Sequence, residues 1–312
     1  MDRIQLNAVR DARRVIADTA IRTPLVRLNF ADDVYLKLEN LQPIGSFKIR
    51  GAANAIAHLQ PEQLERGVVT ASAGNMAQGV AWCARKLGIP CTVIAPATAP
   101  EAKISAIERL GGRVIKVTFD EWWRAFEERA FPGVAGTFIH AFDDPHVMAG
   151  NGTIALEILE DLPDVDAVVI PWGGGGLTCG IASVLRELRP ECRVFTAEVA
   201  TAVPFAASLT AGVPTFVDYQ PSWVDGIGSK GIFPQMFERA RSLVDGALVA
   251  DLGAVASAVR HLAQHNHIIA EGAGACPVAC ALSANLPGKI VSIISGGNLN
   301  SHHLAQILKN DL

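Results

Sequence analysis

The chain has 312 residues, of which 50% are hydrophobic and 19% charged, with a mean hydropathy of +0.27. Such a composition can bury a large core, which excludes a disordered chain, a collagen-like repeat and a small disulfide-stapled domain. The 27 Lys and Arg residues against 31 Asp and Glu give a formal net charge of −4, without a basic run. We therefore expect small-molecule partners, with no nucleic acid and no membrane among them.

The first residues point to a cytoplasmic protein. They are charged from the second position and lack the apolar segment of a signal peptide. The longest uncharged stretch, residues 167–185, contains Pro171 and five glycines, which favours a buried strand and loop over a membrane span. The cysteines include no C-x-x-C pair, so we predict buried thiols in a reducing compartment. They are Cys83, Cys91, Cys179, Cys192, Cys276 and Cys280.

Short β-branched runs alternate with alanine-rich helical stretches along the whole chain. This alternation predicts an α/β fold whose parallel sheets are covered by helices on both faces. Helices are expected at residues 76–87 and 183–188, among others. The predicted strands are residues 67–70, 91–94, 113–117, 167–170, 193–196 and 290–294.

A run of four glycines follows the predicted strand at 167–170 and precedes a helix. Without side chains, successive backbone N–H groups can converge there, and the helix dipole adds positive potential. The alternative is a simple tight turn, but such a turn would need only two glycines, so we predict a phosphate cradle. Neither a dinucleotide fingerprint nor a Walker loop is present, so the phosphate belongs to another kind of ligand. The cradle comprises Gly173, Gly174, Gly175, Gly176 and Leu177.

A lysine opens another alanine-rich helical stretch. Lys48 lies between Phe47 and Ile49, where it can lose its hydration. Desolvation and a helix N-terminus both lower the pKa of an amine toward the neutral form that a Schiff base requires. Taken alone, however, this segment favours a solvated surface lysine, since most lysines are surface groups.

Two more predicted strands end in small polar residues. Ser72, Ala73 and Gly74 expose backbone N–H groups suited to a carboxylate, and Asn75 can bind a second ligand group. A second strand ends in the hydroxyl of Ser295. In open α/β sheets, ligands bind beyond the carboxyl ends of the strands. The four segments together indicate a phosphate-bearing cofactor that reacts with amines.

Five ordered motifs carry a family resemblance over nearly the whole chain. They are E-N-x-Q-x-x-G-S-F-K-x-R-G-A around Lys48, S-A-G-N-x-A-Q-G from Ser72, G-x-G-T-I-A-x-E from Gly150, G-G-G-G-L from Gly173 and S-G-G-N from Ser295. The chain resembles the pyridoxal-phosphate enzymes of the threonine dehydratase and serine racemase group, in the tryptophan-synthase-β-like superfamily of fold type II. The resemblance implies a large discontinuous domain, residues 1–61 plus 144–312, and a small domain, residues 62–143.

The resemblance also implies a role for each candidate residue. Lys48 carries pyridoxal 5′-phosphate as a Schiff base, and Phe47 packs against the ring. The glycine run and Leu177 hold the phosphate, Asn75 bonds the 3′ oxygen, and Ser295 faces the pyridine nitrogen. Near the ring edge lie Glu271 and Gly226. The substrate carboxylate binds at Ser72, Ala73, Gly74, Asn75 and Met76.

The implied reaction is an ammonia-lyase reaction on a β-hydroxy amino acid. A hydroxyl at Ser295, unlike an aspartate, cannot stabilise a fully protonated pyridine ring. The ring is then a weaker electron sink, which favours expulsion of a β-leaving group. Lys48 takes the α-proton and the β-hydroxyl departs, leaving a 2-oxo acid and ammonia. Threonine would give 2-oxobutanoate, and serine would give pyruvate.

Several positions depart from the family pattern. Ala73 stands where racemases of the group have a second serine, so racemisation ranks below elimination. Met76 replaces the usual histidine and Trp172 is bulkier than the usual aliphatic residue, so an unusual β-hydroxy amino acid is a further candidate substrate. A racemase, a β-replacement enzyme and a catalytically silent binding protein remain alternatives.

Metal binding and assembly follow from the resemblance alone. Glu198 is retained from the family's cation site, but Pro204 replaces its second acid. A lone carboxylate is a poor site for a hard cation, so no metal is expected. The family's homodimer is expected, and the lack of an appended regulatory domain after the S-G-G-N motif favours a catabolic role.

Overall fold

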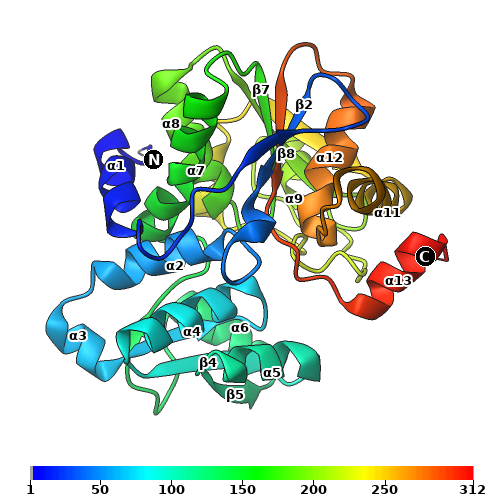
Figure 1. Cartoon of the computed structure of the whole chain (residues 1–312). Coiled ribbons are helices and arrows are strands. Elements are labelled where there is room, and N and C mark those ends of the chain that lie inside the picture. The colour runs from blue at the N-terminus through cyan, green and yellow to red at the C-terminus, as the bar shows by residue number, and fades with distance from the viewer. Residues whose placement is uncertain (1–2, 312) are drawn as a thin grey trace.

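A computed structural model describes residues 3–311 and contains two sheets (Figure 1). In the six-stranded sheet the order is β1-β2-β10-β7-β8-β9, and only the β1–β2 pair is antiparallel. The predicted α/β class with two mainly parallel sheets is confirmed. The strands are β1 (Leu25–Arg27), β2 (Val34–Leu38), β7 (Ala167–Pro171), β8 (Arg193–Val199), β9 (Gly246–Ala250) and β10 (Ile290–Ile294).

The second sheet has four parallel strands in the order β5-β4-β3-β6 and lies in the lower part of Figure 1. Its strands are β3 (Val68–Ala71), β4 (Cys91–Pro96), β5 (Arg113–Val117) and β6 (Thr137–Phe138). The helices in the same part of the chain are α3 (Pro61–Arg66), α4 (Asn75–Leu87), α5 (Glu101–Arg109) and α6 (Phe119–Glu128). Apolar residues of α2, such as Ile49, also belong to the core around this sheet, and the expected domain boundaries stay a prediction.

Helices cover both faces of the six-stranded sheet. One apolar core contains residues of α1, α7, α8 and α10, and the other contains residues of α11 and α12. The helices are α1 (Leu6–Val15), α2 (Lys48–Ala57), α7 (Pro145–Asp161), α8 (Gly176–Leu188), α9 (Pro204–Ala211), α10 (Pro234–Ala240), α11 (Leu252–His261), α12 (Gly272–Ala284) and α13 (Ser301–Lys309). The 3-10 turn η1 (Glu39–Leu41) follows β2, and the π-helical turn η2 (Leu262–Asn266) continues α11.

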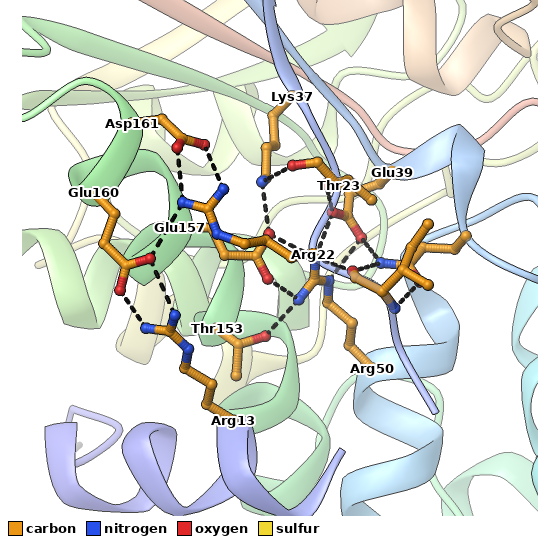
Figure 2. A network of polar contacts seen from close by, with 12 residues as sticks. Arg13, Arg22, Thr23, Lys37, Glu39, Arg50, Thr153, Glu157, Glu160 and Asp161 are labelled. Carbon is orange, nitrogen blue, oxygen red and sulfur yellow. Dashed lines mark hydrogen bonds and ion pairs between the residues drawn. The ribbon is translucent and has the colours of Figure 1, made fainter. Parts of the chain in front are cut away.

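Four buried charges join β2, η1, α2 and α7 in one network (Figure 2). Lys37 Nζ lies 2.6 Å from Glu157 Oε2, and Arg50 Nη1 lies 2.7 Å from Glu157 Oε1. Arg50 Nε also donates to Glu39 Oε2 over 2.8 Å. All four side chains are at most 5% exposed. Burial of an unpaired charge is costly. Here the charges of the two cations are neutralised by those of the two carboxylates.

The prediction of buried, unpaired cysteines is confirmed, since all six thiols are free and buried. Burial raises the pKa of the Cys83, Cys91, Cys179 and Cys192 thiols to about 12, which keeps them protonated and unreactive. Among residues 3–311, no helix combines the length and the apolar character needed to cross a bilayer.

Candidate active site

The candidate residues meet where β7 and β10, adjacent and parallel, end at one edge of the large sheet. The segment before α2 lies against the end of β10, because Ser46 bridges to Gly296 and the N–H of Phe47 donates to the Ser295 carbonyl over 3.0 Å. Parallel strands place their carboxyl ends together, which explains the meeting of segments 250 residues apart. Ser295 is itself 3% exposed.

Lys48 is the first residue of α2, and its amine is held inside the protein. Nζ donates to the Ala141 carbonyl over 2.8 Å and lies 5.1 Å from the centroid of the Phe47 ring. Burial lowers the pKa of Lys48 to about 8, and the charge of Glu271 opposes this shift. A substantial fraction of the amine is therefore neutral near pH 8, as nucleophilic attack requires.

The glycine run forms the turn from β7 into α8. Gly175 has φ +88° and is the N-cap of α8, and no side chain of the described residues caps this helix. A Cβ built on Gly174 would lie 1.9 Å from the Phe142 ring, whereas one on Gly173 would lie 3.6 Å from the Gly226 carbonyl. Gly174 must therefore be a glycine in this arrangement. The unfilled N–H donors at the start of α8 suit a phosphate.

Asn75 connects the two sheets at the first position of α4. Its Nδ2 donates to Glu271 Oε1 over 2.8 Å, and its Oδ1 accepts from Asn298 Nδ2 over 2.7 Å. Burial raises the pKa of Glu271 to about 7, although the hydrogen bond from Asn75 works against the shift. A Cβ on Gly226 would lie 3.5 Å from Glu271 Oε1, which places this glycine beside the same carboxyl group.

The predicted carboxylate loop lies at the N-terminus of α4. Ser72 Oγ accepts from the N–H of Gly74 over 3.1 Å, and Gly74 is the N-cap without a side-chain cap. Ala73 is half-buried in the same loop. Met76 is 2% exposed and packs in the apolar core around the four-stranded sheet. Its predicted contact with substrate stays a prediction.

Trp172, a further departure from the family pattern, lies behind the glycine run, and the retained Glu198 lies beside Phe205, the ring partner of Trp172. Trp172 is 1% exposed and stacks on Phe205, with ring centroids 3.9 Å apart. A Cβ on Gly175 would lie 2.6 Å from the Trp172 ring, so the indole supports the turn. Glu198 accepts from the N–H groups of Phe205 and Ala206 over 2.9 and 2.7 Å, which uses its carboxylate at the start of α9.

The sequence did not single out the loop that follows β6. This loop contains His140, Ala141 and Phe142, and it contacts both Lys48 and the glycine run. It lies beyond the carboxyl end of a parallel strand, which is the signal that found the other segments. A strand of two residues is too short to be recognised from apolar periodicity.

Comparisons with known proteins agree with this arrangement. A family model described as "Pyridoxal-phosphate dependent enzyme" matches residues 16–296. An L-threonine ammonia-lyase of Thermotoga maritima is 42% identical, covering 99% of this chain and 79% of the relative. A catabolic L-threonine dehydratase of Staphylococcus aureus is 37% identical, covering 99% and 93%. The structure of maize serine racemase superposes with a TM-score of 0.89 at 30% identity, covering 99% and 98%.

Proposed function

Because this chain belongs to the pyridoxal-phosphate-dependent enzyme family, we propose that it is a lyase that deaminates L-threonine or a similar β-hydroxy amino acid to a 2-oxo acid and ammonia. Its cofactor is pyridoxal 5′-phosphate, and its class is carbon–nitrogen lyase, as the sequence predicted. The observation that carries the proposal is the convergence of a desolvated lysine amine, an uncapped glycine-rich helix N-terminus and a small-residue loop at one place.

The residues present fit the cofactor. The backbone N–H groups of the Gly173–Leu177 turn would hold the phosphate, where α8 has no capping side chain. Lys48 Nζ would bond covalently to the cofactor, and Phe47 lies beside that amine. Ser295 would face the pyridine nitrogen with a hydroxyl. Asn75 is the candidate for the 3′ oxygen, in exchange for one of its present partners.

When bound, pyridoxal phosphate supplies an electron sink that acidifies the Cα–H bond of an attached amino acid. The N-terminus of α4 and the N–H groups near Ser72 would bind the substrate carboxylate. Once the amine of the substrate has displaced Lys48 from its bond to the cofactor, the freed Nζ would accept the α-proton, since burial favours its neutral form. Loss of the β-hydroxyl as water would leave an unsaturated amine, which hydrolyses to the 2-oxo acid and ammonia.

Elimination is favoured over racemisation by the side chain opposite the lysine. Racemisation needs a second acid/base group on the other face of the substrate, and Ala73 offers only a methyl group in the carboxylate loop. Ser72 has a hydroxyl, whose oxygen accepts from the Gly74 N–H, and the family resemblance assigns this residue to the substrate carboxylate. A lyase needs only the one base, and Lys48 supplies it.

A panel of L-threonine, L-serine, D-serine and bulkier 3-hydroxy amino acids tests the proposal, with release of 2-oxo acid and ammonia as the measurement. We expect L-threonine among the best substrates. Chiral conversion without 2-oxo acid would identify a racemase, and uptake of an added thiol would identify a β-replacement enzyme. No reaction across the panel in the cofactor-loaded protein would overturn the lyase assignment. Survival of the bound cofactor's visible absorption in Lys48→Ala would overturn the lysine assignment.

We also propose that the protein is a cytoplasmic homodimer. Each chain would be divided into its two domains at residues 61/62 and 143/144. Six buried free thiols support a reducing compartment. The dimer rests on the resemblance to the threonine dehydratase group. Light scattering coupled to size-exclusion chromatography would give twice the mass of 33.0 kDa for a dimer. A single 33.0 kDa species at micromolar concentration would contradict it.

A further inference from the structure

His140 is a buried residue next to the candidate active site for which the proposed mechanism has no role. It follows β6 and is 2% exposed. Its Nδ1 accepts hydrogen bonds from the backbone N–H groups of Asp143 and Phe142, over 2.8 and 3.3 Å. A ring nitrogen that accepts carries no proton, so the imidazole is neutral with its hydrogen on Nε2.

The turn that His140 holds carries two contacts to the site. The carbonyl of Ala141 accepts from Lys48 Nζ over 2.8 Å. The ring of Phe142 lies against Gly174, where an added Cβ would be 1.9 Å from it. One imidazole nitrogen therefore fixes the backbone that touches both the reactive amine and the phosphate cradle.

The surroundings keep this imidazole neutral and in place. The Phe126 ring lies 4.3 Å away between centroids, and the Phe142 ring packs edge-on at 4.7 Å. Burial lowers the pKa of His140 to about 3, with help from the charges of Arg129 and Lys48 and against that of Asp143. Arg129 and Asp143 pair with each other at 2.6 Å. The acceptor role of Nδ1 therefore persists at neutral pH.

We propose that His140 is a positioning residue for Lys48, acting through the turn at residues 140–143. By accepting two backbone hydrogen bonds it sets the position of the Ala141 carbonyl, which in turn orients the lysine amine. The inference rests on the proposed function only in treating Lys48 as the reactive amine. The contacts from His140 to the turn and from the turn to Lys48 do not depend on which substrate the enzyme uses.

Three variants separate positioning from packing. His140→Asn keeps an amide oxygen near the place of Nδ1, His140→Gln moves the amide to the place of Nε2, and His140→Leu removes the acceptor. The first measurement, on apoprotein, is amide hydrogen exchange of residues 141–144. The second is the pH midpoint for amine labelling of Lys48, located by peptide mass spectrometry. The third, on the loaded enzyme, is kcat and KM for the best substrate of the panel.

In His140→Leu and His140→Gln we expect the backbone amides of residues 141–144 to exchange their hydrogens about tenfold faster than in the wild type. A lost hydrogen bond is worth about 1 to 1.5 kcal/mol, which corresponds to such a factor. The labelling midpoint of Lys48 should fall by about one unit, because a carbonyl acceptor favours the ammonium form. In both variants kcat should fall while KM stays within about threefold. His140→Asn should stay near the wild type in all three measurements.

Equal behaviour of the Asn and Gln variants would overturn the proposal, as would a folded Leu variant with unchanged exchange and midpoint. If His140→Leu does not fold, the Asn and Gln pair still decides. The exchange and labelling measurements use the apoprotein, so they stand even if the substrate panel shows no lyase activity. Failure of the proposed function and failure of this inference are therefore distinguishable.

Discussion

Replacing Glu157 by glutamine tests whether the buried network depends on charge balance. Glu157 accepts from Lys37 Nζ over 2.6 Å and from Arg50 Nη1 and Nη2 over 2.7 and 2.9 Å. Two cations and two carboxylates now cancel, and the substitution leaves one uncompensated positive charge in the core. Removal of one partner from a buried ion pair typically costs about 3 to 5 kcal/mol. We expect a loss of stability in that range.

Glu160→Gln is the matched control, one helical turn further along α7 (Figure 2). Glu160 pairs with Arg13 and Arg22, but these side chains are 43 to 47% exposed. Exposed pairs contribute about 1 kcal/mol or less, so the control should lose no more than that. The two substitutions make the same chemical change on the same helix, and only burial differs.

Urea unfolding of the apoproteins measures both losses. With a urea dependence of about 3 kcal/mol/M, Glu157→Gln should lower the midpoint by about 1 to 1.7 M, and the control by about 0.3 M or less. Two spectroscopic probes should be followed, since a chain with two sheets can unfold in more than one step. Lys37→Met added to Glu157→Gln restores neutrality and should recover part of the loss. Equal midpoints for the Glu157 and Glu160 variants would refute the reasoning.

Five further substitutions have defined expectations. Lys48→Met should stabilise the apoprotein near pH 7 by at most about 3 kcal/mol, because folding lowers the lysine pKa from 10.5 to about 8. This stability difference between the variant and the wild type should shrink as the pH rises from 8 to 10.5, because the unfolded lysine then also loses its proton; urea midpoints of the two proteins measured side by side across that range would show it, and a constant difference would contradict it. Gly174→Ala should lower Tm by several degrees, because its Cβ would overlap the Phe142 ring, whereas Gly173→Ala should lower it far less; equal Tm values would contradict this. Trp172→Phe should lower the free energy of unfolding by about 1.5 kcal/mol or less, since the indole N–H that it removes is buried without a hydrogen-bond partner. Trp172→Ala should lower it by about 3 to 5 kcal/mol, because it leaves a cavity. A large loss in the Phe variant would reveal a hydrogen bond of the indole.

The strands were predictable where they are rich in β-branched residues. The expected strands at 113–117 and 290–294 coincide with β5 and β10. β2 was missed, because its run V-Y-L-K-L has a single β-branched residue, and a sequence alone does not reveal that Lys37 is 0% exposed. The partner that makes its burial possible, Glu157, lies 120 residues further along the chain. Propensity and periodicity describe local neighbours, and this contact is not local.

The same distinction holds for the site. Lys48 and the glycine run were found because each is a local pattern at the start of a helix. The hydrogen bond from Asn75 to Glu271 joins residues 196 apart, and the sequence indicated both without indicating that they touch. His140 gave no local signal, since its partners are backbone N–H groups that every residue but proline possesses.

Helix α2 carries both Arg50 of the buried network and the candidate lysine, Lys48, which gives the charges a role beyond stability. Lys48 begins α2 without a capping side chain, and Arg50, two residues later, binds Glu39 and Glu157. At 3.6 residues per turn these side chains leave the helix about 200° apart, so Arg50 holds one side while Lys48 extends from the other. A Cβ on Gly51 would lie 2.7 Å from Val147, so α2 also packs closely on α7. Buried ion pairs often contribute little net stability, but here they fix the rotation of the helix that aims Lys48 into the site.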